Sequence, residues 1–321
     1  GISMALTAEK KEIKLIVIDI DGTLLNSKME LSERNEKALK AAAAMGVQIA
    51  FATGKTYNSA KHLFEKLELK APGIFVQGLL TYDAGGSITH QQVLSTAVCR
   101  KVITFAEDRG YFLLAYSGGR ILTRSVNQTI YDQMAKYHET LEPAGSLYNI
   151  LGEVPINKLV AIGEDSRAIK ALRWQLNTML DGSARVVQAG VPNMLEVLPT
   201  GVSKGSALKM LTKDLRIPAD QVMAIGDAEN DIEMIQFAGL GVAMGQADET
   251  VKSHAKYVAP THDEDGVADA IEKFILPEPK PAPEAVVVTD GKTAEASSSS
   301  PEVKPESEAK SAKDGTGEKK S

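Results

Sequence analysis

Residues 14–23 read Lys-Leu-Ile-Val-Ile-Asp-Ile-Asp-Gly-Thr, and the expected fold is built around this stretch. An unbroken apolar run such as Leu15 to Ile18 is typical of a strand that is buried on both faces of a parallel sheet. Asp19 and Asp21 follow the run at once, and Gly22 allows the chain to turn sharply. Ligands of such sheets bind at the carboxyl ends of the strands. The stretch therefore predicts a polar site at the end of a central strand.

Apolar runs that end in polar residues recur along the chain. Strands are expected at 47–52, 222–225, 241–243 and 257–258, and helices at 33–45, 206–212 and 229–236. Ser32 is the expected N-cap of the first helix. Strands that alternate with helices are typical of a parallel sheet covered by helices. The sequence therefore predicts an α/β fold with a Rossmann-like parallel-sheet core.

The pattern changes between residues 87 and 198. A hairpin is expected from 111–116 and 120–123, followed by a helix at 126–139. A strand at 158–162, a helix between Asp165 and Gly182, and strands at 185–188 and 194–197 complete this stretch. We therefore expect an α+β cap domain at 87–198, inserted into a discontinuous core domain formed by residues 12–86 and 199–276.

The two ends of the chain differ in composition from the middle. Residues 277–321 contain no aromatic residue, no Leu and no Ile. Such a segment cannot bury enough apolar surface to offset the entropy lost on ordering, so it is expected to be a disordered tail. Residues 1–11 are expected to be a leader outside the fold, in which Gly1 to Ser3 are a cloning scar.

Composition excludes several classes of protein. The net charge of -6 gives no positive field that would gather nucleic acid or an anionic membrane. No apolar run approaches the roughly 18 residues that a membrane helix needs. The single cysteine, Cys99, excludes an intramolecular disulfide and fits a reducing compartment. We expect a soluble intracellular, cytoplasmic protein without nucleic-acid or membrane partners. A plastid is the alternative if a transit peptide has been removed, and protein partners stay open.

Two further polar motifs offer groups that bind phosphate. Thr53, Gly54 and Lys55 close the strand at 47–52 and supply a hydroxyl, backbone N–H groups and a cation. Lys204 precedes the helix expected at 206–212 and supplies a second cation. Each motif alone is weak, because a Thr-Gly turn is usually structural and a lone lysine usually faces solvent.

A fourth motif, Gly-Asp-Ala-Glu-Asn-Asp at 226–231, follows the strand at 222–225. Acids at the start of a helix are often caps and nothing more. Mg²⁺, however, favours oxygen ligands. Asp19, the backbone carbonyl of Asp21 and Asp227 are expected to supply part of a Mg²⁺ shell, with Asp231 beside them.

Together the four motifs resemble the haloacid dehalogenase superfamily, and the position of the insertion resembles the large α/β (C2-type) cap of its Cof-type branch. The resemblance implies that Asp19 becomes an aspartyl-phosphate and that Asp21 is the general acid and base. The implied catalytic set is Asp19, Asp21, Thr53 and Lys204. The residues implied at the substrate are Gly22, Gly54, Lys55 and Asn230. The residues implied at Mg²⁺ are Asp19, Asp21, Asp227 and Asp231.

Two positions depart from the branch. Lys55 stands where Arg is common, which keeps the charge and loses the planar fork. Gln77-Gly78 stands where Asn-Gly is common. This combination resembles plant and algal members. Both departures bear on substrate preference more than on the type of reaction.

The sequence predicts a Mg²⁺-dependent phosphatase, a phosphoric monoester hydrolase acting on a small phosphomonoester such as a sugar phosphate. The alternatives are a phosphomutase on the same fold and a non-catalytic protein that binds a phosphorylated metabolite. The combination of Asp19, Asp21, Lys204 and Asp227 disfavours the binding protein. The polar cap residues expected as candidates for the rest of the substrate are Ser117, Arg120, Arg124 and Asn193.

Overall fold

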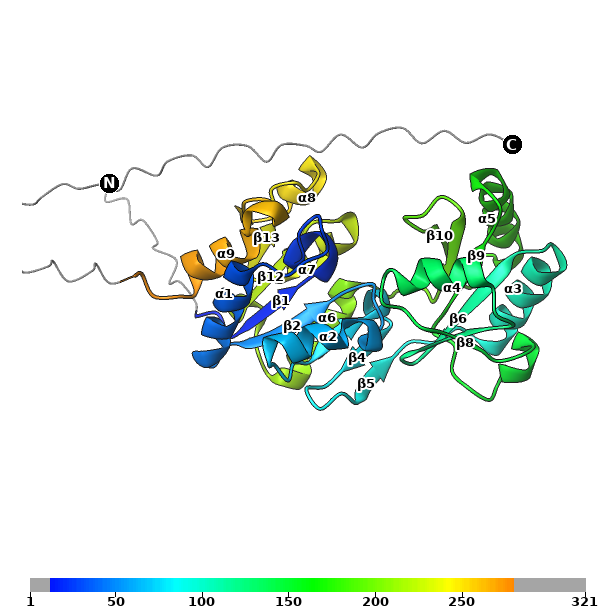
Figure 1. The fold of residues 1–321 in the computed structure, drawn as a ribbon, viewed down its shortest axis with the longest axis horizontal. Coiled ribbons are helices and arrows are strands. Elements are labelled where there is room, and N and C mark those ends of the chain that lie inside the picture. Colours follow the sequence, from blue (N-terminus) through cyan, green and yellow to red (C-terminus); the bar gives the residue numbers. More distant parts are fainter. Residues whose placement is uncertain (1–11, 280–321) are drawn as a thin grey trace, which may run out of the picture. The chain divides into compact units, whose positions relative to one another are not determined.

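The strand expected from the opening stretch, β1 (Leu15–Ile18), lies inside an eight-stranded sheet of the computed structural model, which describes residues 12–279. The sheet has the order β14-β13-β12-β1-β2-β3-β4-β5 (Figure 1). Its other strands are β2 (Gln48–Ala52), β3 (Gly73–Phe75), β4 (Leu80–Tyr82), β5 (Ile88–Gln91), β12 (Val222–Gly226), β13 (Leu240–Ala243) and β14 (Tyr257–Val258). The strands from β14 to β3 are parallel, and β4 and β5 are antiparallel to their neighbours. The predicted α/β fold with a parallel-sheet core is confirmed.

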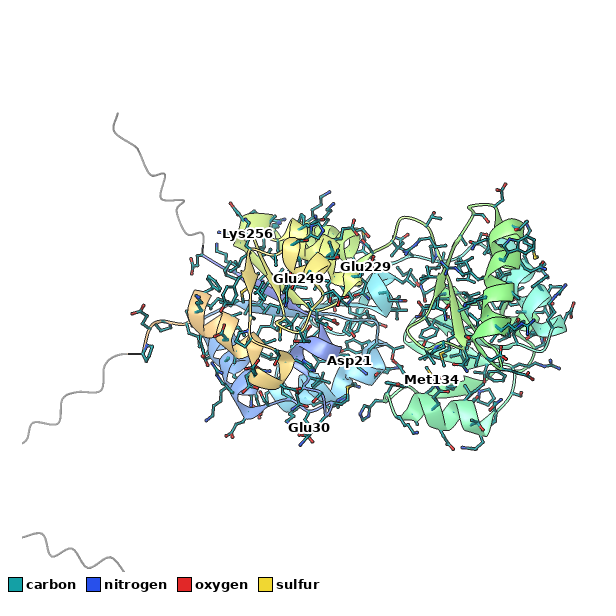
Figure 2. The ribbon with its side chains drawn as sticks, turned by 90° about the horizontal axis from the view of Figure 1, so that it is seen from above. Asp21, Glu30, Met134, Glu229, Glu249 and Lys256 are labelled. Atoms are coloured by element: carbon teal, nitrogen blue, oxygen red, sulfur yellow. The ribbon has the colours of Figure 1, made fainter. Side chains whose placement is uncertain are left out.

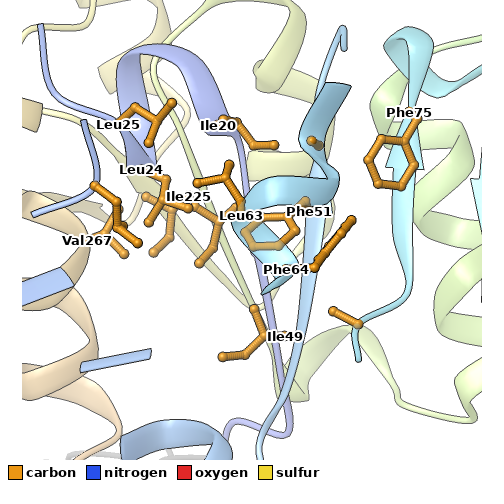
Figure 3. Close-up of a cluster of buried hydrophobic side chains, with 14 of the residues drawn as sticks. Ile20, Leu24, Leu25, Ile49, Phe51, Leu63, Phe64, Phe75, Ile225 and Val267 are labelled. Atoms are coloured by element: carbon orange, nitrogen blue, oxygen red, sulfur yellow. The ribbon is translucent and has the colours of Figure 1, made fainter. Parts of the chain in front are cut away.

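Side chains of β1 alternate between two helical layers, because successive residues of a strand point to opposite faces. Ile16 and Ile18 belong to the buried cluster that includes α1 (Glu33–Ala44), α2 (Tyr57–Leu67) and α9 (Gly266–Phe274). Figure 3 shows part of this cluster, with Phe51 of β2 beside the side chains of α2. Leu15 and Val17 pack with α6 (Lys204–Leu215) and α7 (Ile232–Phe237). Burial on both faces explains the continuous apolar run.

A second, six-stranded sheet has the order β10-β11-β9-β6-β7-β8. Its strands are β6 (Phe112–Ser117), β7 (Arg120–Thr123), β8 (Leu141–Pro143), β9 (Lys158–Ile162), β10 (Arg185–Gln188) and β11 (Met194–Leu198). Helices α3 (Thr96–Asp108) and α5 (Ser166–Leu180) pack on one face of it (Figure 1). Side chains of the other face join α4 (Gln128–Ala135) and the cluster around β1. One helix remains, the short α8 (Glu249–Ser253).

One expected helix was too long, and one strand pairs outside the segment that was expected to be inserted. Strand β5 lies within the range expected for the inserted domain, yet it pairs with β4 in the larger sheet, so that sheet extends beyond residue 87. The helix expected at 126–139 is shorter, since α4 covers Gln128–Ala135 and His138 has a φ of 62°, which a helix does not allow. Residues 137–139 instead form a loop that reaches the larger sheet's helix α2.

Both sheets belong to one compact unit that ends at Glu278. The leader expected at 1–11 and nearly all of the tail expected at 277–321 lie outside the described residues. Across residues 12–279, no helix has both the length and the apolar character that a membrane span requires.

Candidate active site

Asp19 leaves β1 at the edge of the sheet where the parallel strands end. Its backbone N–H still bonds to the carbonyl of Ile225 on β12, and its Oδ1 accepts a hydrogen bond of 2.8 Å from the N–H of Ile20. The following turn, Ile20–Leu24, passes through Gly22 at a φ of 76°. A Cβ on Gly22 would lie 2.4 Å from Oδ2 of Asp227. A bare backbone is therefore required for both the turn and the approach of Asp227.

Lys204 reaches Asp19 from the start of α6. The helix was expected to begin at 206, but Ser203 is its N-cap and forms a reciprocal capping box with Ser206, so Lys204 is its first residue. The buried Nζ of Lys204 lies 3.2 Å from Oδ1 of Asp19 and 2.8 Å from Oδ1 of Asp231. Helix geometry, and not a free loop, fixes this cation beside the two carboxylates.

Asp227 and Asp231 complete a group of carboxylates after β12. Oδ2 of Asp231 accepts hydrogen bonds from the N–H groups of Asp227 (3.0 Å) and Ala228 (3.1 Å), so Asp231 organises the loop that carries Asp227. The hydroxyl of Thr23 donates to Oδ1 of Asp227 at 2.9 Å. One oxygen from each of Asp19, Asp227 and Asp231 lies within 4.8 Å of the others. Of the four residues expected at Mg²⁺, three therefore have side-chain oxygens that lie close together: Asp19, Asp227 and Asp231.

The electrostatics of this group favour an added cation. Burial raises the pKa of the Asp19 carboxyl well above its usual value, Asp231 and Asp227 raise it further, and Lys204 opposes them. Burial also raises the pKa of Asp227. Burial by itself would lower the pKa of Lys204, but Asp19 and Asp231 raise it above the usual lysine value. Among the described residues Lys204 is the one cation that forms an ion pair with this group, through Asp19 and Asp231. Clustered oxygen donors with excess negative charge fit a hard divalent cation.

Asp21 lies beside this group and not within it. Its side chain, labelled in Figure 2, is 45% exposed, and its Oδ2 lies 3.4 Å from Nζ of Lys55. Its Oδ1 is buried and has no hydrogen-bond partner among residues 12–279. Nζ of Lys55 also donates to the carbonyl of Tyr137, at 3.3 Å, in the loop after α4. An unpartnered carboxyl oxygen at this edge is free to meet a bound molecule.

The remaining predicted residues occupy the same edge. Thr53 is buried, and its Oγ1 accepts a hydrogen bond of 3.1 Å from the N–H of Lys55, which leaves its hydroxyl hydrogen free to donate. Gly54 and Asn230 are exposed. The expected site residues therefore lie on the loops that follow β1, β2 and β12 and on the first turn of α6.

A cavity of about 340 Å³ adjoins the loop after β12 and the start of α6. Its wall on the larger-sheet side includes Lys204, Glu229 and Asn230, and its wall on the smaller-sheet side includes Arg185 and Glu196. None of the four polar residues expected in the cap lines it: Ser117, Arg120, Arg124 and Asn193. Arg120 instead forms an exposed ion pair with Glu142, and the amide of Asn193 donates to the carbonyl of Gly163. Arg185 begins a predicted strand, but strand alternation does not reveal which face meets the cavity.

Comparison with known proteins identifies the family to which the chain belongs. Residues 16–271 match the family model of the haloacid dehalogenase-like hydrolases. The chain is 31% identical over 274 residues to the Bacillus subtilis 5-amino-6-(5-phospho-D-ribitylamino)uracil phosphatase YcsE, covering 85% of this chain and 100% of that one. It is 36% identical over 275 residues to the chloroplastic endoribonuclease YBEY of Arabidopsis thaliana, covering 83% of this chain. The match spans 47%, about half, of the length of that relative.

A solved structure shares the fold. The haloacid dehalogenase-like hydrolase from Bacteroides thetaiotaomicron has a TM-score of 0.76 and 30% identity, and the match covers 82% of this chain and 100% of that one. The family match extends from β1 to α9 and so includes every loop of the site. The chain therefore belongs to the haloacid dehalogenase-like hydrolase family, among relatives that carry the name phosphatase.

Proposed function

We propose that the protein is a Mg²⁺-dependent phosphatase that hydrolyses a small phosphomonoester through an aspartyl-phosphate on Asp19. One observation carries the proposal: the buried Asp19 carboxylate lies 3.2 Å from the ammonium of Lys204, within a group of three carboxylates. A nucleophile, a cation for phosphoryl oxygens and a set of metal ligands thus share one edge of the sheet. The names of relatives such as YcsE support the same reaction class.

The metal would be held by Asp19, Asp227 and the backbone carbonyl of Asp21, with Asp231 supporting the loop. When bound, Mg²⁺ supplies charge neutralisation to the phosphoryl group. Electrostatic stabilisation and positioning are expected to account for most of the rate enhancement. The carboxylate group fits this ion because its oxygen atoms converge within 4.8 Å.

Asp19 and Asp21 divide the covalent chemistry between them. In the first step an oxygen of Asp19 attacks phosphorus in line, the bond from phosphorus to the ester oxygen breaks, and protonated Asp21 gives its proton to the departing alkoxide. In the second step water attacks the same phosphorus and gives a proton to the Asp21 carboxylate. The acyl-phosphate bond breaks, which restores Asp19 and releases inorganic phosphate.

Thr53, Lys204 and backbone N–H groups hold the phosphoryl oxygens during both steps. The free hydroxyl hydrogen of Thr53 and the Lys204 ammonium are donors that suit a tetrahedral oxyanion. We assign Lys55, Gly54 and Asn230 to the ester oxygen and the rest of the substrate, and of these Asn230 lines the cavity. We infer that the inserted segment expected at 87–198 acts as a cap over this entrance.

We propose a sugar or polyol phosphate, or a related metabolite, as the substrate class. The cavity of about 340 Å³ is of a size for a small metabolite and too small for a macromolecule. The relative YcsE, whose name specifies a phosphoribitylamino-uracil, is consistent with a polar, hydroxylated leaving group. For the compartment we propose the cytoplasm, with a plastid as the alternative.

The decisive experiment measures phosphate release from p-nitrophenyl phosphate and from a panel of sugar phosphates, with and without Mg²⁺. Asp19→Asn should abolish turnover because an amide is a poor nucleophile, and Asp21→Asn should lower kcat by about 10²- to 10⁴-fold. The exposed acid Glu142 provides the matched control, since Glu142→Gln should leave kcat unchanged. If Asp19→Asn kept the wild-type rate, Asp19 would not be the nucleophile.

The same assay separates the two alternative functions. Isomerised sugar phosphate without release of inorganic phosphate would identify a phosphomutase. No release from any phosphomonoester in the panel would favour a protein that binds a phosphorylated metabolite without converting it.

A further inference from the structure

A left-handed turn follows β3 at Val76, Gln77 and Gly78. Their φ values are 48°, 60° and 102°. A positive φ is unfavourable for a β-branched residue such as Val76, and strained backbone of this kind persists only where its surroundings fix it. The strain therefore raises the question of which contacts hold the turn.

On one side, the turn contacts the residues that carry the phosphate-binding groups. The N–H of Val76 donates to the carbonyl of Lys55 at 2.9 Å, and the N–H of Gln77 donates to the carbonyl of Thr53 at 3.1 Å. A Cβ on Gly78 would lie 2.3 Å from the carbonyl oxygen of Ser203 and 3.1 Å from the nitrogen of Lys204. The turn thus packs against both Thr53 and the first turn of α6.

On the other side, the Gln77 side chain reaches the smaller sheet. Its Oε1 accepts a hydrogen bond of 2.9 Å from Nζ of Lys158 on β9, and its Nε2 donates to Oε2 of Glu196 on β11 at 2.9 Å. Lys158 and Glu196 pair directly at 2.8 Å. The three side chains therefore form a closed triangle, with both ends of the amide engaged.

Lys158 is buried, whereas Gln77 and Glu196 are only partly buried and both line the cavity. The side chains of Lys158 and Glu196 are 4% and 12% exposed. Burial would raise the pKa of Glu196, but Lys158 and Gln77 lower it below its usual value, so the carboxylate stays ionised and bound to both partners. Loss of the Glu196 carboxylate would leave the Lys158 ammonium without its ionic partner, whereas loss of the Gln77 amide would leave the Lys158–Glu196 ion pair in place.

We propose that Gln77 is a positioning residue, through which Lys158 and Glu196 of the smaller sheet fix the places of Thr53 and Lys204 at the phosphate. The expected effect of Gln77 on kcat rests on the proposed phosphatase function. Its chemistry differs from that of a substrate contact: both ends of the amide already bind protein groups, so Gln77 acts through the turn and through the backbone of Thr53 and Ser203. Docking of the smaller sheet and assembly of the phosphate site are thereby coupled.

The test uses the full chain with Gln77→Leu, which keeps much of the side-chain volume and removes the amide. We expect kcat to fall about tenfold or more for both p-nitrophenyl phosphate and glucose 6-phosphate, with KM within about twofold, because misplaced groups weaken the transition state more than binding. Glu196→Gln should also lower kcat. The double variant should lose less than the product of the two single losses, since both act through one contact.

Hydrogen exchange provides a readout that does not depend on activity. In Gln77→Leu, backbone amides of 53–56 and 203–206 should exchange faster, while those of β1 stay unchanged. Glu142→Gln removes the exposed ion pair with Arg120 within the smaller sheet and should alter neither exchange nor kcat.

Three outcomes would overturn the coupling. A KM change that differs between the two substrates, with exchange unaltered, would make Gln77 a substrate ligand. Unchanged kcat and exchange would show that the amide has no positioning role. A uniform rise in exchange across β1 would show general destabilisation. If the wild type released no phosphate while Gln77→Leu still accelerated exchange at 53–56 and 203–206, the proposed function would fail and the structural coupling would stand.

Discussion

Gly22 illustrates how one backbone position connects the turn after β1 to the carboxylates proposed to hold Mg²⁺. Its φ of 76° favours glycine, and a Cβ there would meet the Asp227 carboxylate at 2.4 Å. The same glycine therefore serves two requirements, one conformational and one steric. These two effects can be separated experimentally because Gly46 has a comparable φ of 90° and no atom within 4 Å of a built Cβ.

We predict that Gly22→Ala and Gly46→Ala both lower the free energy of unfolding, by about 1–2 kcal/mol each, because alanine is unfavourable at positive φ. Only Gly22→Ala should weaken Mg²⁺ binding, by about tenfold, because the new methyl group displaces Asp227. Urea unfolding and a Mg²⁺ titration by calorimetry measure the two quantities. Equal Mg²⁺ affinity in both variants would contradict a role for this close approach.

At the scale of the single residue, the motifs indicated which side chains lie together at the end of β1, and their roles stay predictions. Asp19, Lys204, Asp227 and Asp231 lie within one hydrogen-bonded and ion-paired group, although they come from three separate motifs of the sequence. None of the four polar residues expected in the cap lines the cavity. Arg185 and Glu196 line the cavity, and neither stood out in the sequence, because an alternating strand shows no sign of which neighbour it faces.

The first turn of helix α6 positions Lys204 beside Asp19. Ser203 caps it through a hydrogen bond of 2.9 Å from the N–H of Ser206, and Lys204 follows directly. The capping box starts the helix earlier than the apolar pattern alone suggested. A weakened cap would therefore loosen both the helix and the Lys204 ammonium.

Ser203→Ala should lower the free energy of unfolding by about 1 kcal/mol, as expected for loss of an N-cap. It should also lower kcat, because the backbone that carries Lys204 is no longer fixed. The matched control is Ser95→Ala, since Ser95 caps α3 through a 3.1 Å bond to the N–H of Val98, far along the chain from the site motifs. Thermal unfolding should report similar losses for both variants, and steady-state kinetics should report a fall in kcat only for Ser203→Ala.

The stability of the whole molecule is expected to depend on pH through its acidic group. The pKa values of Asp19 and Asp227 are raised above 3.8 by burial and by neighbouring carboxylates. The folded protein without metal therefore binds protons that the unfolded chain releases. The resulting stability is present below the usual aspartate pKa and is lost as pH rises through the raised values, by up to about 1.4 kcal/mol for each pKa unit.

In EDTA, the melting temperature should therefore be lower at neutral pH than at a pH just above 3.8, the usual aspartate pKa, because this group loses its stabilising protons as pH rises. Mg²⁺ should remove this fall, because a bound cation stabilises the ionised carboxylates, so the shift that Mg²⁺ produces should grow with pH. Asp227→Asn retains an acceptor for Thr23, removes one charge and should reduce both the fall in EDTA and the Mg²⁺ shift. Thermal melts of both proteins at the two pH values, with and without Mg²⁺, provide the measurement. A Mg²⁺ shift that is the same at both pH values would argue against a metal at this group.

The sequence by itself determined the parallel core, the order of the strand-end motifs and the types of charge that meet at Asp19. It could do so because apolar periodicity, caps and turns are local, and because parallel strands bring their ends to one edge. Only the tertiary structure decided that Lys55 bonds to Tyr137 and that Gln77 joins Lys158 to Glu196, over separations of 82 and 81 residues for Lys55–Tyr137 and Gln77–Lys158. Such contacts depend on how the two sheets pack together. The apolar periodicity of each sheet is local and does not predict that packing.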